Sequence, residues 1–159
     1  MEEVLQLLAE DARLSAAQIA ERVGRSEKEV RTAIEKLEAG GVIRRYKTVV
    51  DWEKAGIEHV YGFIEVRVSP ERGAGFDAVA ERIMGFPEVH SLYLMSGTYD
   101  LLVVIQGKTM REVAFFVAEK LAPLEHVLST ATHFVLKRYK VDGDVLAERA
   151  EVKRLPVTP

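Results

Sequence analysis

The sequence contains no cysteine, and that absence excludes several kinds of site. Without thiols the 159-residue chain forms no disulfide, binds no zinc through thiolates and has no cysteine nucleophile. The four histidines stand far apart, and His126 and His133, seven positions apart on an expected strand, point to opposite faces. No nucleophile elbow or phosphate-binding loop is present. We expect no metal, no cofactor and no catalytic residue.

Long apolar runs and a basic leader are also missing. No segment approaches the roughly 18 apolar residues of a membrane helix, and Met1-Glu2-Glu3 lacks the basic start of a signal peptide. With 48% hydrophobic and 30% charged residues, the composition is that of one ordinary globular domain or two small ones. We expect a cytoplasmic protein with no membrane partner.

Basic residues are concentrated in one segment. The formal net charge of -3 gives no overall indication of nucleic acid binding. Residues 24–47 nevertheless hold seven Lys or Arg against four Glu, and the segments before and after them are both acidic. A short basic segment of this kind is typical of a small DNA-reading module, although a solvated helix face has the same pattern.

Two helices in the first fifty residues begin with the same capping pattern, after an earlier helix marked by Val4, Leu7 and Leu8. Ser15 with Gln18, and Ser26 with Glu29, supply side chains that satisfy the open backbone donors of a helix start. Apolar residues follow at i, i+3, i+4 and i+7: Ala16, Ile19, Ala20 and Val23, then Val30, Ala33, Ile34 and Leu37.

The spacing of Ala20, Gly24 and Val30 matches a helix-turn-helix, whose second helix reads DNA. Arg31 could bond a guanine bidentately, and Thr32 could pack on a thymine methyl. The predicted DNA-binding set, which includes groups suited to phosphates, is Ser26, Glu27, Lys28, Arg31, Thr32, Arg44, Arg45 and Lys47. The alternative is a three-helix domain whose solvated charges bind nothing.

The rest of the chain predicts a second domain. Residues 42–50 are rich in β-branched side chains and predict a strand or wing that completes a DNA-binding domain at 1–50, before a linker at 51–57. In the domain at 58–140, the apolar period predicts strands at 59–68, 89–96, 101–106 and 126–140. Helices begin at Phe76 and, with a third capping box, at Thr109. Residues 141–159 form a polar tail.

This order predicts an α+β protein: an N-terminal winged helix-turn-helix, then a ferredoxin-like βαββαβ sandwich domain. Helices would cover one face of the sheet. The segment from Leu101 to Ile105 is apolar on both faces, and Phe63, Leu92 and Leu94 are expected to add to the uncovered side. We therefore expect a homodimer packed sheet to sheet, with a tetramer or octamer as the higher assembly.

Several stretches together resemble the Lrp/AsnC family of bacterial and archaeal transcription regulators over residues 2–140. They are the helix-turn-helix, GGVIRRYKTVVDWEKAG at 40–56, MSGTYDLLVVI at 95–105 and LSTATHFVLKRYK at 128–140. The resemblance implies a sequence-specific regulator that binds double-stranded DNA. It also implies a RAM effector domain that holds a small effector, usually an amino acid, between subunits near the turn at 97–100.

The effector-binding residues that the resemblance implies are Gly97, Thr98, Tyr99, Asp100, Thr130 and Thr132. The amides of the turn could hold a carboxylate, and Asp100 could pair with an ammonium group. Without the family, the same four turn residues are those of an ordinary hairpin.

An enzyme is the main alternative class. The segment 73–78 formally fits a dinucleotide-binding fingerprint, but residues 69–72 lengthen its turn. Sirohaem decarboxylases have a similar architecture and use histidine and arginine side chains near a tetrapyrrole. His90, Tyr93 and Arg111 are the residues here that could take such roles. The turn here lacks the His-Asn-Tyr pattern of that group, so we expect no enzyme.

Overall fold

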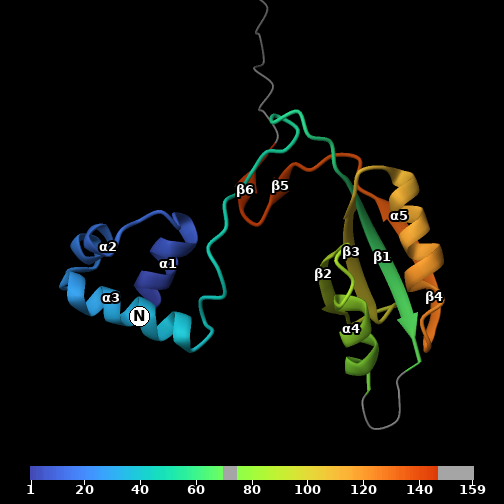
Figure 1. The fold of residues 1–159 in the computed structure, drawn as a ribbon, viewed down its shortest axis with the longest axis horizontal. Coiled ribbons are helices and arrows are strands. Elements are labelled where there is room, and N and C mark those ends of the chain that lie inside the picture. Colours follow the sequence, from blue (N-terminus) through green and yellow to red (C-terminus); the bar gives the residue numbers. More distant parts are fainter. Residues whose placement is uncertain (70–74, 147–159) are drawn as a thin grey trace, which may run out of the picture. The chain divides into compact units, whose positions relative to one another are not determined.

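The computed structural model describes residues 1–69 and 75–146 (Figure 1). The chain forms two compact units, Met1–Val50 and Asp51–Pro159. The start of the dinucleotide-like segment, and the predicted tail from residue 147 onward, lie outside the described residues. Across the part of the chain that is described, no helix is long and apolar enough to cross a membrane.

The first unit is a three-helix domain composed of α1 (Glu2–Glu10), α2 (Ala16–Val23) and α3 (Glu27–Ala39). Both capping boxes predicted here are confirmed, because Ser15 and Ser26 each accept from the amide three residues on and receive that residue's side chain in return. Gly24 ends α2 in the left-handed conformation, with φ 65°. The helices pack on a shared core of Val4, Leu8, Ile19, Ala20 and Val30.

The strand predicted at 42–50 is not formed. The amides of Val42 and Ile43 both donate to the Leu37 carbonyl, at 2.9 and 3.1 Å, and so close α3. The segment 42–50, which we call the arm, then pairs with none of the described strands. β-Branched residues favour extended backbone, but a strand forms only where a neighbour takes its hydrogen bonds.

Residues 51–57 form a hydrogen-bonded turn at the start of the second unit. The Asp51 carbonyl accepts from the Ala55 amide at 3.1 Å, and the Trp52 carbonyl accepts from the Ile57 amide at 2.9 Å. The Trp52 ring meets the His59 ring edge-on, with centroids 5.5 Å apart. This contact packs the turn against the residues that lead into the sheet.

The second unit has the predicted element order: β1 (Val60–Val68), α4 (Asp77–Met84), β2 (Val89–Leu94), β3 (Leu101–Gly107), α5 (Met110–Phe116) and β4 (Val127–Phe134). The strands form one antiparallel sheet in the order β2-β3-β1-β4, which is the ferredoxin-like arrangement. Helices α4 and α5 lie on one face of it (Figure 1). The core between them contains Ile64, Val66, Val79, Ile83, Leu101, Val103 and Val113. The predicted α+β fold class is confirmed.

Helix α5 departs from the prediction at both ends. The Thr109 hydroxyl accepts from the Glu112 amide at 3.1 Å. The Glu112 carboxylate, however, accepts from the Lys108 amide at 2.7 Å, so only half of the predicted third capping box is present. After Phe116 the helix continues as a wider π-helical turn, Val117–Leu121.

The last strand is shorter than predicted. β4 ends at Phe134, opposite Gly62 near the beginning of β1. One more bond follows, in which the Val135 amide donates to the Tyr61 carbonyl, and beyond it β1 offers no further partner. The predicted strand to residue 140 is therefore wrong over 135–139. The next residues form a hairpin of two short strands, β5 (Lys140–Val141) and β6 (Asp144–Val145).

Gly62 of β1 lies directly beneath α5. A Cβ atom at this position would stand 2.8 Å from Cγ1 of Val113, closer than carbon atoms pack. Replacing Gly62 with alanine is expected to lower the free energy of unfolding by about 1 to 3 kcal/mol, measured by chemical denaturation. Alanine at the exposed Ser129 of β4 is the control, with an expected change within about 0.5 kcal/mol. Equal stability of the two variants would mean that α5 shifts without cost.

Candidate nucleic-acid interface and effector site

The outward face of α3 carries the predicted DNA-reading residues in exposed positions. Lys28, Arg31 and Thr32 are all exposed, whereas Val30, which points to the opposite side, is fully buried. The Arg31 side chain is 62% exposed, so an approaching duplex can reach it. An exposed polar face on a helix that is fixed by its apolar side is what major-groove readout requires.

Two further pairings occupy the start of α3. The Glu27 carboxylate forms an ion pair with Arg31, one helical turn along, and both side chains are more than half exposed. The Ser26 hydroxyl donates to the Glu29 carboxylate at 2.6 Å, and this bond is the main cause that lowers the pKa of Glu29. The i,i+4 spacing of Glu27 and Arg31 signals their pairing, which the sequence interpretation missed.

The predicted backbone-binding residues Arg44, Arg45 and Lys47 lie on the arm, and all three are exposed. The arm is attached to α3 by Tyr46, whose hydroxyl donates to the Glu38 carboxylate at 2.8 Å. Partial burial, followed by this bond to a carboxylate, raises the pKa of Tyr46. The first unit therefore carries exposed basic side chains on both α3 and the arm.

The turn predicted to bind an effector joins β2 to β3. Gly97, with φ 149°, and Thr98 are exposed, whereas Tyr99 and Asp100 are half-buried. One carboxylate oxygen of Asp100 accepts from the Val68 amide of β1 at 2.8 Å. The proposed ammonium partner therefore already has a backbone role, which is to fix the turn against the end of β1.

Thr130 and Thr132 lie on β4, and β1 separates that strand from the turn at 97–100. They pair in register with Val66 and Ile64, whose side chains are in the core, so both threonines are on the helix-covered side of the sheet. Within one chain, the described residues do not bring the turn and the two threonines into contact.

The sheet face away from the two helices is apolar at its centre. Phe63 and Val104 are register partners there, with Leu102 and Tyr93 paired beside them. The Phe63 side chain is 37% exposed and that of Tyr93 52% exposed, whereas Val104 is buried among its neighbours. We call these four residues the open sheet face.

The prediction that Leu92 and Leu94 add to this face is wrong. The register between β2 and β3 shifts between Val89 and Ser91, so Leu92 pairs with Val103 and Leu94 with Leu101. Both partners belong to the core, and Leu92 packs against it. A one-residue bulge turns every later side chain to the other side of a strand, and the alternation of residues alone does not reveal it.

The residues considered for tetrapyrrole chemistry do not converge. His90 meets the Tyr61 ring edge-on, with centroids 6.4 Å apart, and Tyr93 belongs to the open sheet face. Arg111 instead lies 5.1 Å above the ring centroid of Phe115 on α5. Among the described residues there is also no cluster of three or more side chains that could hold a metal ion.

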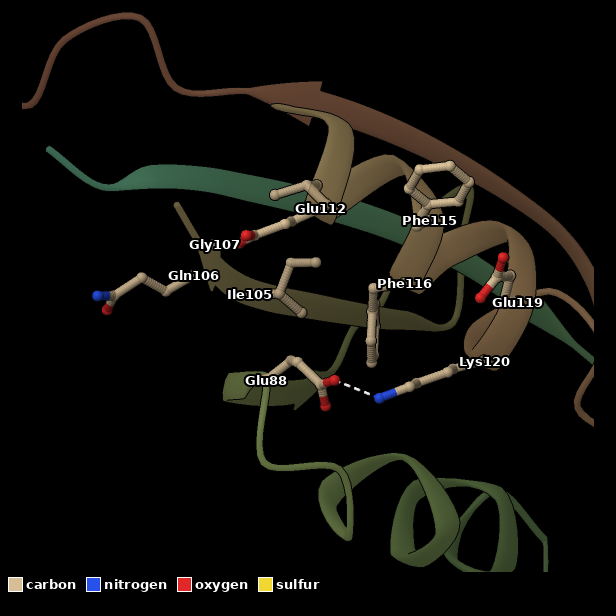
Figure 2. Close-up of a pocket in the computed structure, with 10 residues that line it drawn as sticks. Glu88, Ile105, Gln106, Gly107, Glu112, Phe115, Phe116, Glu119 and Lys120 are labelled. Carbon is tan, nitrogen blue, oxygen red and sulfur yellow. Dashed lines mark hydrogen bonds and ion pairs between the residues drawn. The ribbon is translucent and has the colours of Figure 1, made fainter. Parts of the chain in front are cut away.

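A cavity of about 270 Å³, which the sequence did not predict, opens between α5 and the end of β3 (Figure 2). It is lined by Glu88, Ile105, Gln106, Gly107, Glu112, Val113, Phe115, Phe116, Glu119 and Lys120. The Lys120 ammonium bonds to the Glu88 carboxylate across it, and this bond lowers the pKa of Glu88. None of the predicted effector residues lines this cavity.

Both units match known protein families. Residues 2–44 match a winged helix-turn-helix DNA-binding model, and residues 62–145 match the Lrp/AsnC ligand binding domain. The HTH-type transcriptional regulator YugG of Bacillus subtilis (strain 168) is 50% identical over 158 residues, which are 99% of this chain and 95% of that protein. The proline dehydrogenase transcriptional activator of Rhizobium radiobacter is 28% identical, with 88% and 89% of the two chains covered.

Solved structures agree with this fold. The transcriptional regulator NMB0573 of Neisseria meningitidis, in complex with L-Met, has a TM-score of 0.72 and 27% identity, with 87% of this chain and 89% of that chain covered. AsnC of E. coli has a TM-score of 0.69 at 20% identity, with 87% and 91% covered, and so supports the fold alone.

Proposed function

The chain belongs to the Lrp/AsnC family of transcriptional regulators, and from that membership we propose that it reads specific DNA sequences under the control of a small effector. The observation that carries the proposal is the exposed face of α3, which presents Lys28, Arg31 and Thr32 from a capped helix-turn-helix. The family regulates transcription and is not one of enzymes, so the decarboxylase alternative is not retained.

We assign DNA binding to residues 1–50, effector sensing and dimerisation to residues 58–140, and the connection between them to residues 51–57. Arg31 and Thr32 would contact base edges, while Ser26, Lys28 and the basic residues of the arm would bind phosphates. Such a regulator would act in the cytoplasm, on double-stranded DNA.

The proposed dimer forms through the open sheet face. Phe63 and Tyr93 leave apolar surface in water that a second copy, packed sheet to sheet, would cover. A dimer also presents two α3 helices at once, and binding to both half-sites strengthens the complex without any new kind of contact.

The proposed effector is an amino acid held near Gly97, Thr98, Tyr99 and Asp100, with Thr130 and Thr132 supplying hydroxyl groups. Within one chain β1 separates the two parts of this set, and the two threonines face away from the open sheet face, so the proposed site would be shared between subunits of different dimers. The complex of the relative NMB0573 with L-Met supports an amino-acid effector. Binding would favour one arrangement of subunits, and so change how recognition helices match the ~34 Å repeat of DNA.

Two measurements test this function. A gel shift of labelled upstream DNA, with unlabelled random DNA as competitor, should leave a specific complex; complete loss to the competitor would refute sequence-specific reading. Isothermal titration with each of the twenty amino acids should give heat with at least one of them. Absence of heat from all twenty would remove the effector from the proposal and leave the DNA function to stand alone.

The ion pair between Glu27 and Arg31 predicts that Glu27 weakens DNA binding. Replacing Glu27 with glutamine frees the guanidinium and removes a negative charge near the phosphates, so affinity for duplex DNA should rise roughly two- to five-fold at low salt. Fluorescence anisotropy of a labelled duplex measures the change. Glu10→Gln on α1 is the charge-matched control and should leave the DNA affinity unchanged. If its affinity rises as much as that of Glu27→Gln, the rise comes from the net charge of the protein and not from the ion pair with Arg31.

A further inference from the structure

We propose that the cavity between α5 and β3 binds a small molecule that carries a primary ammonium group on a short apolar chain. This site goes beyond the proposed function, because it is separate from the turn at 97–100. The turn adjoins Leu101 at the beginning of β3, whereas the cavity adjoins Gly107 at its end. Six residues of strand place the two sites about 20 Å apart.

The walls of the cavity select for positive charge. Glu88, Glu112 and Glu119 bring three carboxylates, and Lys120 brings the one ammonium group among the lining residues. Lys120 is bonded to Glu88, and Glu112 receives one backbone amide, from Lys108. The lining therefore keeps an excess of negative charge, which disfavours an anionic ligand and favours a cation.

Glu88 offers a specific acceptor. Its Oε1 atom takes the bond from Lys120, while its Oε2 atom is shielded from solvent and has no hydrogen-bond partner in the described part of the structure. A shielded carboxylate oxygen without a donor is unfavourable. The Lys120 side chain is 44% exposed and that of Glu88 is 33% exposed, so Lys120 can move outward and leave the accessible part of the Glu88 carboxylate to the ammonium group of a ligand.

The opposite wall is apolar and is shaped by the π-helical turn. Phe116 reaches the cavity from α5 and Ile105 reaches it from β3 (Figure 2). Val113 of α5 also lines it. The wider turn separates the buried Phe116 and Leu121 by five residues, and it carries Lys120 towards Glu88 (Figure 2). Single π-helical turns within α-helices are frequent at functional sites.

The volume suits a small ligand. The cavity is open to solvent on one side, and its volume is about 270 Å³. This is just below the usual range for ligand pockets. A branched alkyl chain of four or five carbons with one ammonium group fits this space, its chain against the phenylalanine and its charge against Glu88.

Isothermal titration of the full chain with isopentylamine is the direct test. We expect a dissociation constant on the order of 1 mM or tighter. Isovalerate, which has a similar carbon skeleton and a carboxylate in place of the ammonium group, should bind at least tenfold more weakly. Titration with leucine tests whether the ammonium group can come from an amino acid as well as from a simple amine. Binding of isovalerate but not of the amine, or of neither, would overturn the proposal.

Two variants with opposite expected effects locate the binding. Glu88→Gln should weaken isopentylamine binding at least tenfold, and Lys120→Met should strengthen it several-fold, because the competing ammonium group is gone. Glu81→Gln, the same change on the exposed side of α4, is the matched control and should have no effect. Thermal unfolding of each variant checks that the fold is kept.

The two proposals can fail separately. Asp100→Asn alters the turn and leaves the cavity intact, so amine binding should be unchanged in this variant. Loss of amine binding in Asp100→Asn together with full binding in Glu88→Gln would place the amine at the turn and reject the cavity, while leaving the proposed function in place.

Discussion

Replacing Phe63 with glutamate is expected to convert the proposed dimer into monomers and to lower affinity for a two-half-site operator by roughly 10²- to 10⁴-fold. Phe63 is at the centre of the open sheet face, paired with Val104 and 37% exposed in the single chain. A carboxylate there would be buried in the proposed dimer two residues from Glu65, which already pairs with the neighbouring His133, and a second negative charge at this place is strongly unfavourable. Sedimentation velocity measures the assembly, and anisotropy with single and paired half-sites measures the DNA affinity.

Met84→Glu is the matched control for this experiment. Met84 ends α4 and its side chain is 60% exposed, so the same charge is introduced away from the open sheet face. This variant should keep both the assembly and the DNA affinity. If Phe63→Glu sediments as the parent protein does, the open sheet face is not the dimer interface.

Replacing Arg31 with alanine is expected to cost about 1 to 3 kcal/mol of binding free energy on the specific site and to relax the preference for one base pair. The cause is the loss of a bidentate contact from an exposed guanidinium on α3. Affinities for the operator and for single-base variants of it measure both effects.

Lys47→Ala separates base reading from charge. Lys47 is exposed on the arm, so its loss should weaken binding to all sequences alike and reduce the salt slope by about one unit. If Arg31→Ala keeps the parent's base preference and loses affinity equally for all sequences, as expected of Lys47→Ala, then Arg31 contacts phosphates and not base edges.

The features predicted correctly from sequence are those that local chemistry decides. The capping boxes at Ser15 and Ser26 depend on neighbouring residues, and the structure has both. The βαββαβ order followed from the apolar period, which is also a local signal.

The errors share a different cause, because each depends on residues far away in the sequence. The composition of the arm and of residues 135–139 favours extended backbone, but neither segment has a strand beside it to pair with. The bulge before Ser91 depends on how β2 meets β3. The cavity at Glu88 depends on Lys120, thirty-two positions later, and no spacing rule connects the two.

Trp52 is the only tryptophan in the chain, and its edge-on contact with His59 gives the beginning of the second unit an intrinsic optical reporter. Indole emission responds to the polarity and the quenching groups around the ring, so any event that parts these two rings should change its colour and intensity. Stopped-flow emission could then follow, without dye or label, how quickly an added metabolite or duplex changes the surroundings of this ring.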